Sequence, residues 1–253
     1  MRQRTLTGLL ALTLSAAACG GGGPENAAPA TPAPTVNPVN AATAGNVAGR
    51  ITFAGTAPKP DVVRMDSDPN CVQQGVTPTD ERVLIGDAGA LQNVFVYVKD
   101  GLGNLRFPIP ATPVVLDQKG CHYVPHVLGV QVGQNLEVVN SDPTLHNVHA
   151  VAKANQEFNQ GQPLPGMKFT RQFSTPEVMV PFKCDVHSWM NAFIGVLDHP
   201  YFAVTGADGS FSLKGLPPGT YTIEAWHETL GTQTQSVTIG EKESKEIAFT
   251  FKA

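Results

Sequence analysis

Short runs of β-forming residues recur from position 46 to the C-terminus, and this pattern limits the fold more than any other feature of the sequence. Turn-forming glycine, proline, asparagine and aspartate separate the runs, at a spacing of about ten residues. Many runs alternate strictly, as where Val94, Val96 and Val98 alternate with Phe95 and Tyr97. No long helical period is present, and only a short helix at 153–158 is expected. The pattern predicts an all-β chain of antiparallel sandwiches.

We divide these runs into two sandwiches, 46–198 and 199–253. The stretch TGADGSFSLKGLPPGTYTIEA has a hairpin turn at Asp208-Gly209, and a Pro-Gly turn leads into an alternating strand. It resembles the carboxypeptidase regulatory-like, or prealbumin-like, domain, but it is short for a whole sandwich of that kind. Residues 46–58, which include VAGRITFAGTAP, look like the missing first strand. We therefore hypothesise that the first domain is inserted into the second.

The N-terminal stretch MRQRTLTGLLALTLSAAAC has the form of an export signal. Arg2 and Arg4 precede an apolar run that is too short to span a bilayer as a mature helix, which predicts a signal peptide over 1–18. The small residues before Cys19 resemble the bacterial lipobox, which implies lipidation of Cys19. Ala16 stands where the lipobox usually has leucine, so a plain cleaved signal is the alternative.

The following segment, 19–45, is rich in glycine, proline, alanine and threonine and has almost no large apolar residue. Such a composition predicts a disordered tether behind the lipidated N-terminus. We expect an exported protein on the periplasmic face of a bacterial membrane, with the outer membrane favoured, or on the cell surface. The net charge of −4 and the absence of a basic run exclude nucleic acid as a partner.

The stretch PFKCDVHSWMNAF places Cys184, His187 and Met190 at three-residue steps. A thiolate, imidazoles and a weak thioether suit copper, and two histidines with one cysteine and a distant methionine form the electron-transfer copper arrangement. Such a site needs a second histidine. The upstream stretch NLEVVNSDPTLHNVHAV supplies one, because His146 opens a predicted strand there.

Together, VGQNLEVVNSDPTLHNVHA and PFKCDVHSWM resemble the cupredoxins, and among them the amicyanin-like and plastocyanin-like proteins. The resemblance implies a Greek-key cupredoxin sandwich with one type 1 copper, whose ligands would be His146, Cys184, His187 and, axially, Met190. It also implies that Asn147 supports the ligand loop, with its backbone N–H bonded to the cysteine sulfur.

In the family, the ligand corresponding to His187 reaches the surface and passes the electron. The resemblance therefore implies an exposed His187, ringed by Trp189, Phe193 and residues 163–165. Such an apolar patch suits brief docking of a redox partner.

The remaining cysteines and histidines have less specific surroundings. With Cys19 and Cys184 assigned, Cys71 and Cys121 remain, and in an exported protein they are expected to form a disulfide. His122 and His126 could share a strand face as a second, weaker metal site, or be ordinary surface residues.

Four other candidates receive the simpler interpretation. His149 follows His146 by three positions, so a strand would point it to the opposite face. Met167 is a competing thioether that lies in no matching motif. His199 and His227 are expected at exposed positions.

These observations favour a monomeric electron carrier, not an enzyme, with transient redox protein partners and a lipid anchor in a membrane. A multicopper oxidase or nitrite reductase would need further coppers, usually marked by His-x-His pairs, and the sequence has none. A non-redox copper carrier or sensor and a cell-surface binding module remain as alternatives.

Overall fold

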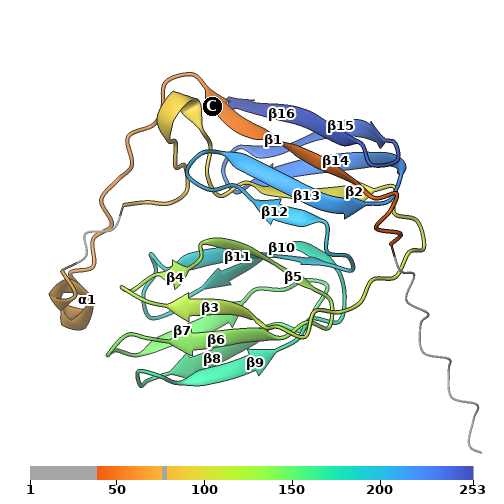
Figure 1. Ribbon diagram of the computed structural model, residues 1–253. Helices are drawn as coiled ribbons and strands as arrows, with labels where there is room; N and C mark the ends of the chain where they lie inside the picture. The colour runs from red at the N-terminus through yellow and green to blue at the C-terminus, as the bar shows by residue number, and fades with distance from the viewer. Residues whose placement is uncertain (1–38, 76–78, 253) are drawn as a thin grey trace, which may run out of the picture. The chain divides into compact units, whose positions relative to one another are not determined.

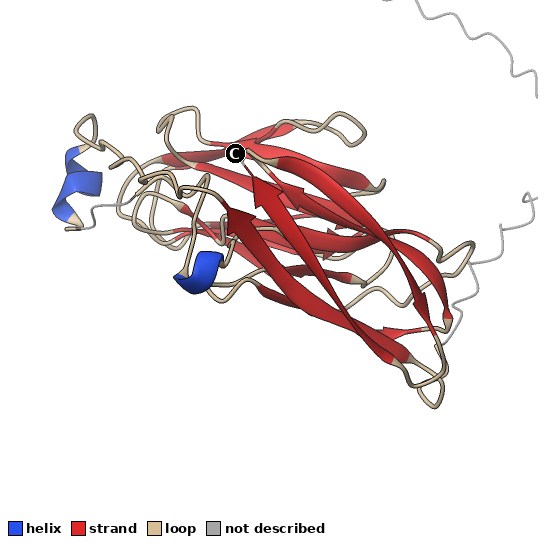
Figure 2. Cartoon of the chain, turned by 90° about the horizontal axis from the view of Figure 1, so that it is seen from above, coloured by secondary structure: helices blue, strands red, loops and turns tan. Residues whose placement is uncertain are grey.

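The computed structural model describes residues 39–75 and 79–252. Strands make up nearly half of this part of the chain, and the helical segments in it are the short α1 (Pro69–Gln73) and η1 (Asp87–Gly89) (Figure 2). The expectation of an all-β chain is confirmed. The predicted signal peptide, Cys19 and most of the predicted tether lie outside the described residues. No helix among the described residues has the length and apolar character needed to cross a membrane.

The helix expected at 153–158 is wrong. This segment is a turn that leads into β8 (Phe158–Gln162), and the carboxylate of Glu177 accepts hydrogen bonds from the backbone N–H groups of Lys153, Ala154 and Asn155. Because these donors point at one side chain, the backbone follows the turn without forming a helical ladder.

Two sheets form the first sandwich, and one hydrophobic cluster lies between them. The five-stranded sheet has the order β5 (Val127–Gln131), β11 (Asn191–Leu197), β10 (Glu177–Lys183), β7 (His146–Ala150), β8 (Phe158–Gln162). The four-stranded sheet has the order β4 (Tyr123–Val124), β3 (Val114–Gln118), β6 (Leu136–Asn140), β9 (Lys168–Arg171). Alternation explains the burial: in β6, Leu136 and Val138 enter the core while the residues between them are partly exposed.

The second sandwich has its own cluster between two further sheets. One sheet has the order β13 (Ser210–Leu216), β1 (Gly45–Ala54), β16 (Ser244–Lys252). The other has the order β12 (Phe202–Val204), β2 (Phe95–Asp100), β14 (Gly219–His227), β15 (Gly231–Ile239).

The predicted boundary at position 198 does not divide the sheets. β1 pairs with β13 and β16 of the second sandwich (Figure 1), as the insertion hypothesis requires. β2 also belongs to the second sandwich, because it pairs with β12 and β14. The prediction placed β2 in the first domain because β2 lies close in sequence to the strands of that domain. The strands that pair with β2 lie far along the chain.

The sheets are also not purely antiparallel. β1 runs parallel to β16, β5 to β11, and β3 to β6. The turn residues used in the prediction report only on local hairpins, and parallel neighbours need longer connections that leave no short-range signal.

The strict alternation at 94–98, which runs into β2, has a particular cause. Val94, Val96 and Val98 enter the core of the second sandwich, while Phe95 and Tyr97 enter a third cluster on the other side of the sheet. This third cluster also contains residues of β5, β10 and β11 from the first sandwich. β2 is therefore buried on both faces.

Candidate metal centre

Two segments of the first sandwich bring the candidate ligands together. β7 begins at His146, and the antiparallel register of β7 against β10 pairs His149 with Lys183. The chain that leaves β10 therefore runs beside the start of β7, and it carries Cys184 and His187 in the loop before β11. Backbone hydrogen bonds close this loop, from the Cys184 N–H to the Met190 carbonyl at 3.1 Å and from the Met190 N–H to the His187 carbonyl at 2.9 Å.

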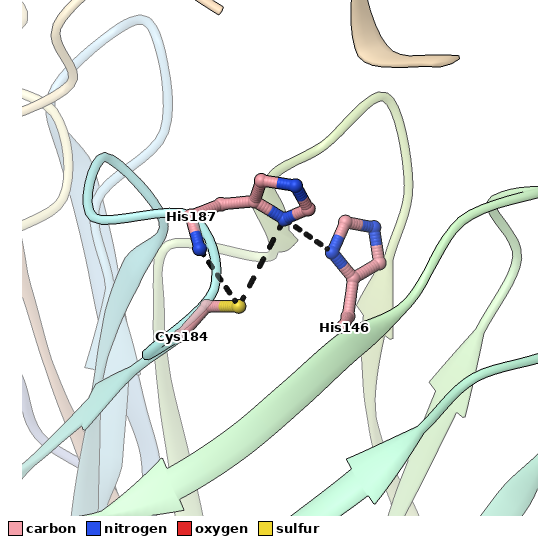
Figure 3. Close-up of side chains that lie close together, drawn as sticks. All are labelled: His146, Cys184 and His187. Atoms are coloured by element: carbon pink, nitrogen blue, oxygen red, sulfur yellow. Dashed lines mark hydrogen bonds between the residues drawn. The ribbon is translucent and has the colours of Figure 1, made fainter. Parts of the chain in front are cut away.

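His146, Cys184 and His187 form a buried group whose ligand atoms all lie within 4.8 Å of one another. The Nδ1 atoms of the two histidines are 2.9 Å apart, and Nδ1 of His187 lies 3.9 Å from Sγ of Cys184 (Figure 3). Met190 is also buried and packs in the same core cluster as Cys184. The structure thus brings the three predicted equatorial ligands together and places the predicted axial ligand in the same loop.

The surroundings of Cys184 favour a thiolate. Burial opposes ionisation, but hydrogen bonds from His146 and from the backbone N–H groups of Asn147 and His187 outweigh it, so the pKa of Cys184 falls below its ordinary value. The thiolate is the form of cysteine that binds metals.

Each imidazole is held from behind by a carboxylate. Nε2 of His146 lies 2.9 Å from Oδ2 of Asp142, and Nε2 of His187 lies 3.0 Å from Oδ2 of Asp68. Burial works against the charge on Asp142, yet hydrogen bonds from His146 and from two backbone N–H groups lower its pKa, so it stays ionised. An ionised carboxylate only accepts hydrogen bonds, so each histidine donates from Nε2 and its Nδ1 faces the other ligands.

The pKa values of the two histidines are shifted in opposite directions. Burial lowers the pKa of His146, but the hydrogen bond to Asp142 and the one to Cys184 outweigh it, and the pKa is raised. The pKa of His187 is lowered, first by burial and then by the charge on His146, against the effect of Asp68. The two imidazoles of the metal-free protein are therefore not both positively charged. His187 is the neutral one, so its Nδ1 keeps a lone pair that points toward Cys184.

Asn147 fixes the ligand loop to β7. Its Oδ1 accepts the backbone N–H of Asp185 at 2.7 Å and that of Val186 at 3.3 Å, and it lies 3.3 Å from Sγ of Cys184. Its Nδ2 donates to the side chain of Asn159 at 2.6 Å. The amide side chain thus connects both ligand-bearing segments.

A segment far from the ligands in sequence covers His187. We call residues 63–75 the cap; it contains α1, and Cys71 within it forms a disulfide with Cys121 in the loop before β4. Sγ of Cys71 lies 3.9 Å from Nε2 of His187, and the ring of Trp189 lies 4.9 Å from the imidazole. His187 is consequently only 2% exposed.

The exposed His187 implied by the family resemblance is therefore wrong for this chain, because the cap occupies the position through which the imidazole would reach solvent. Phe193 does not ring His187 either. Its ring packs edge-on against His126 and at a tilt against Trp226 of the second sandwich.

The other histidines lie apart from the three-ligand group. His149 bonds the carboxylates of Asp185 and Glu157 on the outer face of β7. His122 bonds the Gly120 carbonyl, and His126 bonds Glu228 and the Asn191 carbonyl. Within the described ranges, no group of close ligand atoms includes His122 or His126.

Two histidines and one methionine complete the set. His199 and His227, expected to be exposed, are both buried, and burial lowers the pKa of each, that of His227 to about 4. Met167 lies in the turn before β9, where its carbonyl accepts from the backbone N–H of Asn140.

The sequence reasoning missed Asp68 and Asp142. Both stand in a Ser-Asp-Pro turn, at 67–69 just before Cys71 and at 141–143 just before His146. The repeated tripeptide was the available signal. The tripeptide alone did not show that these two turns, far apart in the chain, place their aspartates against two neighbouring histidines.

The donor set fits a bound metal ion. Thiolate and imidazole donors suit both copper and zinc, and a thioether beside them favours copper. Two overlapping groups, Asp68 with Cys71 and His187, and Cys121 with Asp142 and His146, use the disulfide sulfurs. They are therefore surroundings of the first group and offer no separate thiolate.

Comparison with known proteins gives one family match, in the C-terminal part of the chain. Residues 191–252 match the model of the carboxypeptidase regulatory-like domain. The match begins in β11, which belongs to the first sandwich, and runs through the strands of the second. A search of curated proteins finds no match.

Among solved structures, the chain is similar to copper proteins. A Cu-containing nitrite reductase from Thermus scotoductus SA-01 matches with 21% identity and a TM-score of 0.33, over 37% of this chain and 24% of that one. A Cu(I) form of a methionine-to-alanine mutant of amicyanin matches with 22% identity and a TM-score of 0.30, over 35% of this chain and 85% of that one. An oxidized proline-to-glycine mutant of amicyanin matches with 19% identity and a TM-score of 0.31, over 40% and 97%. The chain thus spans about a quarter of the length of the nitrite reductase that it matches.

Proposed function

We propose that this protein carries single electrons through one type 1 copper held by His146, Cys184 and His187, with Met190 as the axial ligand. The observation that carries the proposal is the buried convergence of two imidazole nitrogens and one sulfur within 4.8 Å of one another. A bound copper ion would supply the one-electron redox chemistry, because this donor set accepts both Cu(I) and Cu(II).

The surroundings of the ligands favour electron transfer over chemistry on a substrate. Asp142 and Asp68 hold the imidazoles, and Asn147 and backbone N–H groups hold the sulfur and its loop. Fixed ligands rearrange little when the charge of the metal changes, which is what a carrier needs. All three ligands are also buried, so the protein keeps water from the centre.

The cellular setting is part of the proposal. The export signal and the lipobox-like Cys19 support a lipoprotein of a bacterial membrane that faces the periplasm, with residues 19–45 as its tether. We propose a monomer that docks transiently with redox proteins. Because the cap covers His187, such a partner would approach the cap itself or the exposed loops that flank the ligands.

The test is to add Cu(II) to the purified metal-free protein and record its visible spectrum. We expect an intense thiolate-to-copper band that disappears on reduction and is absent in Cys184→Ser. Ser188→Ala is the matched control, because Ser188 is an exposed residue of the same loop, and it should keep the band.

The alternatives predict other results. Copper binding without an intense band, or rapid loss of copper to a chelator, would favour a copper carrier or sensor. A protein that binds zinc but gives no coloured copper complex would overturn the proposal.

A further inference from the structure

We infer that Asp68 and Asp142 are positioning residues of the metal centre, which hold both imidazoles with Nδ1 toward the metal and favour the oxidised form. The inference rests on the proposed function and goes beyond it, because it names two residues that set the redox behaviour. Both lie outside the ligand motifs, and Asp68 comes from the cap.

Asp142 is fixed by several donors at once. One carboxylate oxygen accepts the Gly120 N–H at 2.8 Å, and the other accepts both the Cys121 N–H at 2.8 Å and Nε2 of His146 at 2.9 Å. The side chain is 2% exposed. A buried carboxylate with three donors has one stable orientation, so it determines which nitrogen of His146 carries the proton.

Asp68 is fixed in a similar way on the other histidine. One oxygen accepts the Asn70 N–H at 2.7 Å at the start of α1, and the other accepts Thr144 Oγ1 at 2.7 Å and Nε2 of His187 at 3.0 Å. Thr144 lies two residues before His146. The bond from Thr144 therefore ties the cap to the segment that carries the first ligand.

The disulfide joins the two carboxylate sites. Asp142 bonds the backbone of Cys121, while Asp68 stands at the N-terminus of the helix that contains Cys71. Both carboxylates are therefore anchored to the same covalent link. These contacts hold the cap so that the carboxylate of Asp68 meets His187. The same contacts keep the cap over the histidine.

A carboxylate that accepts the Nε2 proton of a ligand histidine makes the opposite nitrogen a stronger donor and fixes the ring orientation. Two negative charges beside a buried centre also stabilise Cu(II) relative to Cu(I), since attraction grows with the metal charge and is strong where water is excluded. Both effects lower the reduction potential of the centre.

The experiment measures reduction potentials of copper-loaded full-length protein with Asp68→Asn and Asp142→Asn. Asparagine keeps an acceptor oxygen and the size of the side chain but removes the charge. We expect each variant to keep the blue band and shift toward Cu(I), roughly tenfold in the Cu(II)/Cu(I) ratio at a fixed applied potential, which equals about 59 mV for one electron.

Asp66→Asn is the matched control, because Asp66 is an exposed residue of the cap two positions from Asp68, and its potential should stay at the wild-type value. Asp68→Glu, which restores the charge, should shift less than Asp68→Asn. Thermal unfolding of each variant shows whether it is folded.

A second readout needs no copper. In ¹⁵N NMR of the metal-free wild-type protein, His146 and His187 should both carry a proton on Nε2. Blue copper with unchanged potentials in both asparagine variants would overturn the inference while the proposed function stands. If the copper-treated wild type shows no blue band, the proposed function is overturned. If the NMR spectrum shows that Nε2 of either histidine carries no proton, the positioning role is overturned by that result alone.

Discussion

At the scale of single residues, Asn147 shows how one side chain serves two segments. It belongs to β7, next to the proposed ligand His146, but its amide oxygen accepts backbone N–H groups of the loop after Cys184. The family resemblance implied a supporting role for this residue. The structure adds that its Nδ2 is held in turn by Asn159 at 2.6 Å, so the amide has a fixed orientation and presents its oxygen to the loop.

Asn147→Ala should lower the free energy of unfolding of the metal-free protein by about 2 kcal/mol, because the partly buried backbone N–H groups of Asp185 and Val186 lose their acceptor. Urea unfolding, followed by tryptophan fluorescence, measures the change. Asn104→Ala, at an exposed turn position, should change it by less than about 0.5 kcal/mol. Equal unfolding midpoints for the wild type and the Asn147 variant would contradict this role.

At the scale of elements, the cap has few means of staying in place. α1 has five residues, too few for an independent helix, and much of the cap surface is exposed. What holds it are Met65 and Cys71 in the core, the bonds of Asp68, and the disulfide. The side-chain contacts are lost on unfolding, whereas the disulfide persists. The disulfide is therefore the main constraint on the cap in the unfolded chain.

Replacing both Cys71 and Cys121 by serine should lower the free energy of unfolding by about 4 kcal/mol, from the closure entropy of a loop with a sequence separation of 50. Urea unfolding of the wild type and of the double variant measures this difference. Thiol titration of the unfolded metal-free wild type serves as the control and should detect the thiol of Cys184 but not those of Cys71 and Cys121. A double variant with the wild-type midpoint would show that the link does not stabilise the fold.

Most strands of both sandwiches could be predicted, because alternation is a local property of the sequence. The proximity of His146 to Cys184 and His187 could be predicted as well, since Cys184 and His187 lie in one loop and His146 lies in a recognisable run. The cap over His187 could not. It depends on a contact between residues separated by 119 positions, and α1 has no periodicity. The membership of β2 was missed for the same reason, because its neighbours β12 and β14 lie about a hundred residues further along.

At the scale of the whole described chain, the first and second sandwiches are joined by the chain itself and also pack against each other. The third cluster joins β2 to β5 and β11, where the Phe95 ring packs so closely on Gly195 that an added Cβ would lie 2.3 Å from its Cζ. A polar contact accompanies it. His126 of the first sandwich bonds Glu228 of the second, and its other nitrogen bonds the carbonyl of Asn191, the residue after Met190. The second sandwich therefore supports the strand that follows Met190, the proposed axial ligand.

This contact predicts a pH-dependent contribution to stability. Burial lowers the pKa of His126, but the hydrogen bond and charge of Glu228 and the charge of Glu81 outweigh it and raise the pKa. The folded protein therefore binds this proton more tightly than the unfolded chain. The contribution is complete below the unfolded pKa of about 6.5 and is lost as the pH rises through the raised folded value. Two other groups also act on this pair, because Asp80 is attracted to His126 while His227 repels it.

Glu228→Gln isolates this contribution, because the lowered pKa values of His187 and His199 affect the wild type and the variant alike. The charge of Glu228 raises the pKa of His227, so the variant lowers that pKa below its wild-type value of about 4, and His227 is neutral above pH 6 in both proteins. The variant should be less stable by about 2 kcal/mol near pH 6, where His126 is charged, and the difference should shrink steadily toward pH 9. Urea unfolding of the metal-free protein at a series of pH values provides the measurement. Glu246→Gln, at an exposed position of β16, should follow the wild type throughout. A difference that stays constant or grows with pH would mean that His126 is neutral in the folded protein, and the contact would then be an ordinary hydrogen bond between the sandwiches.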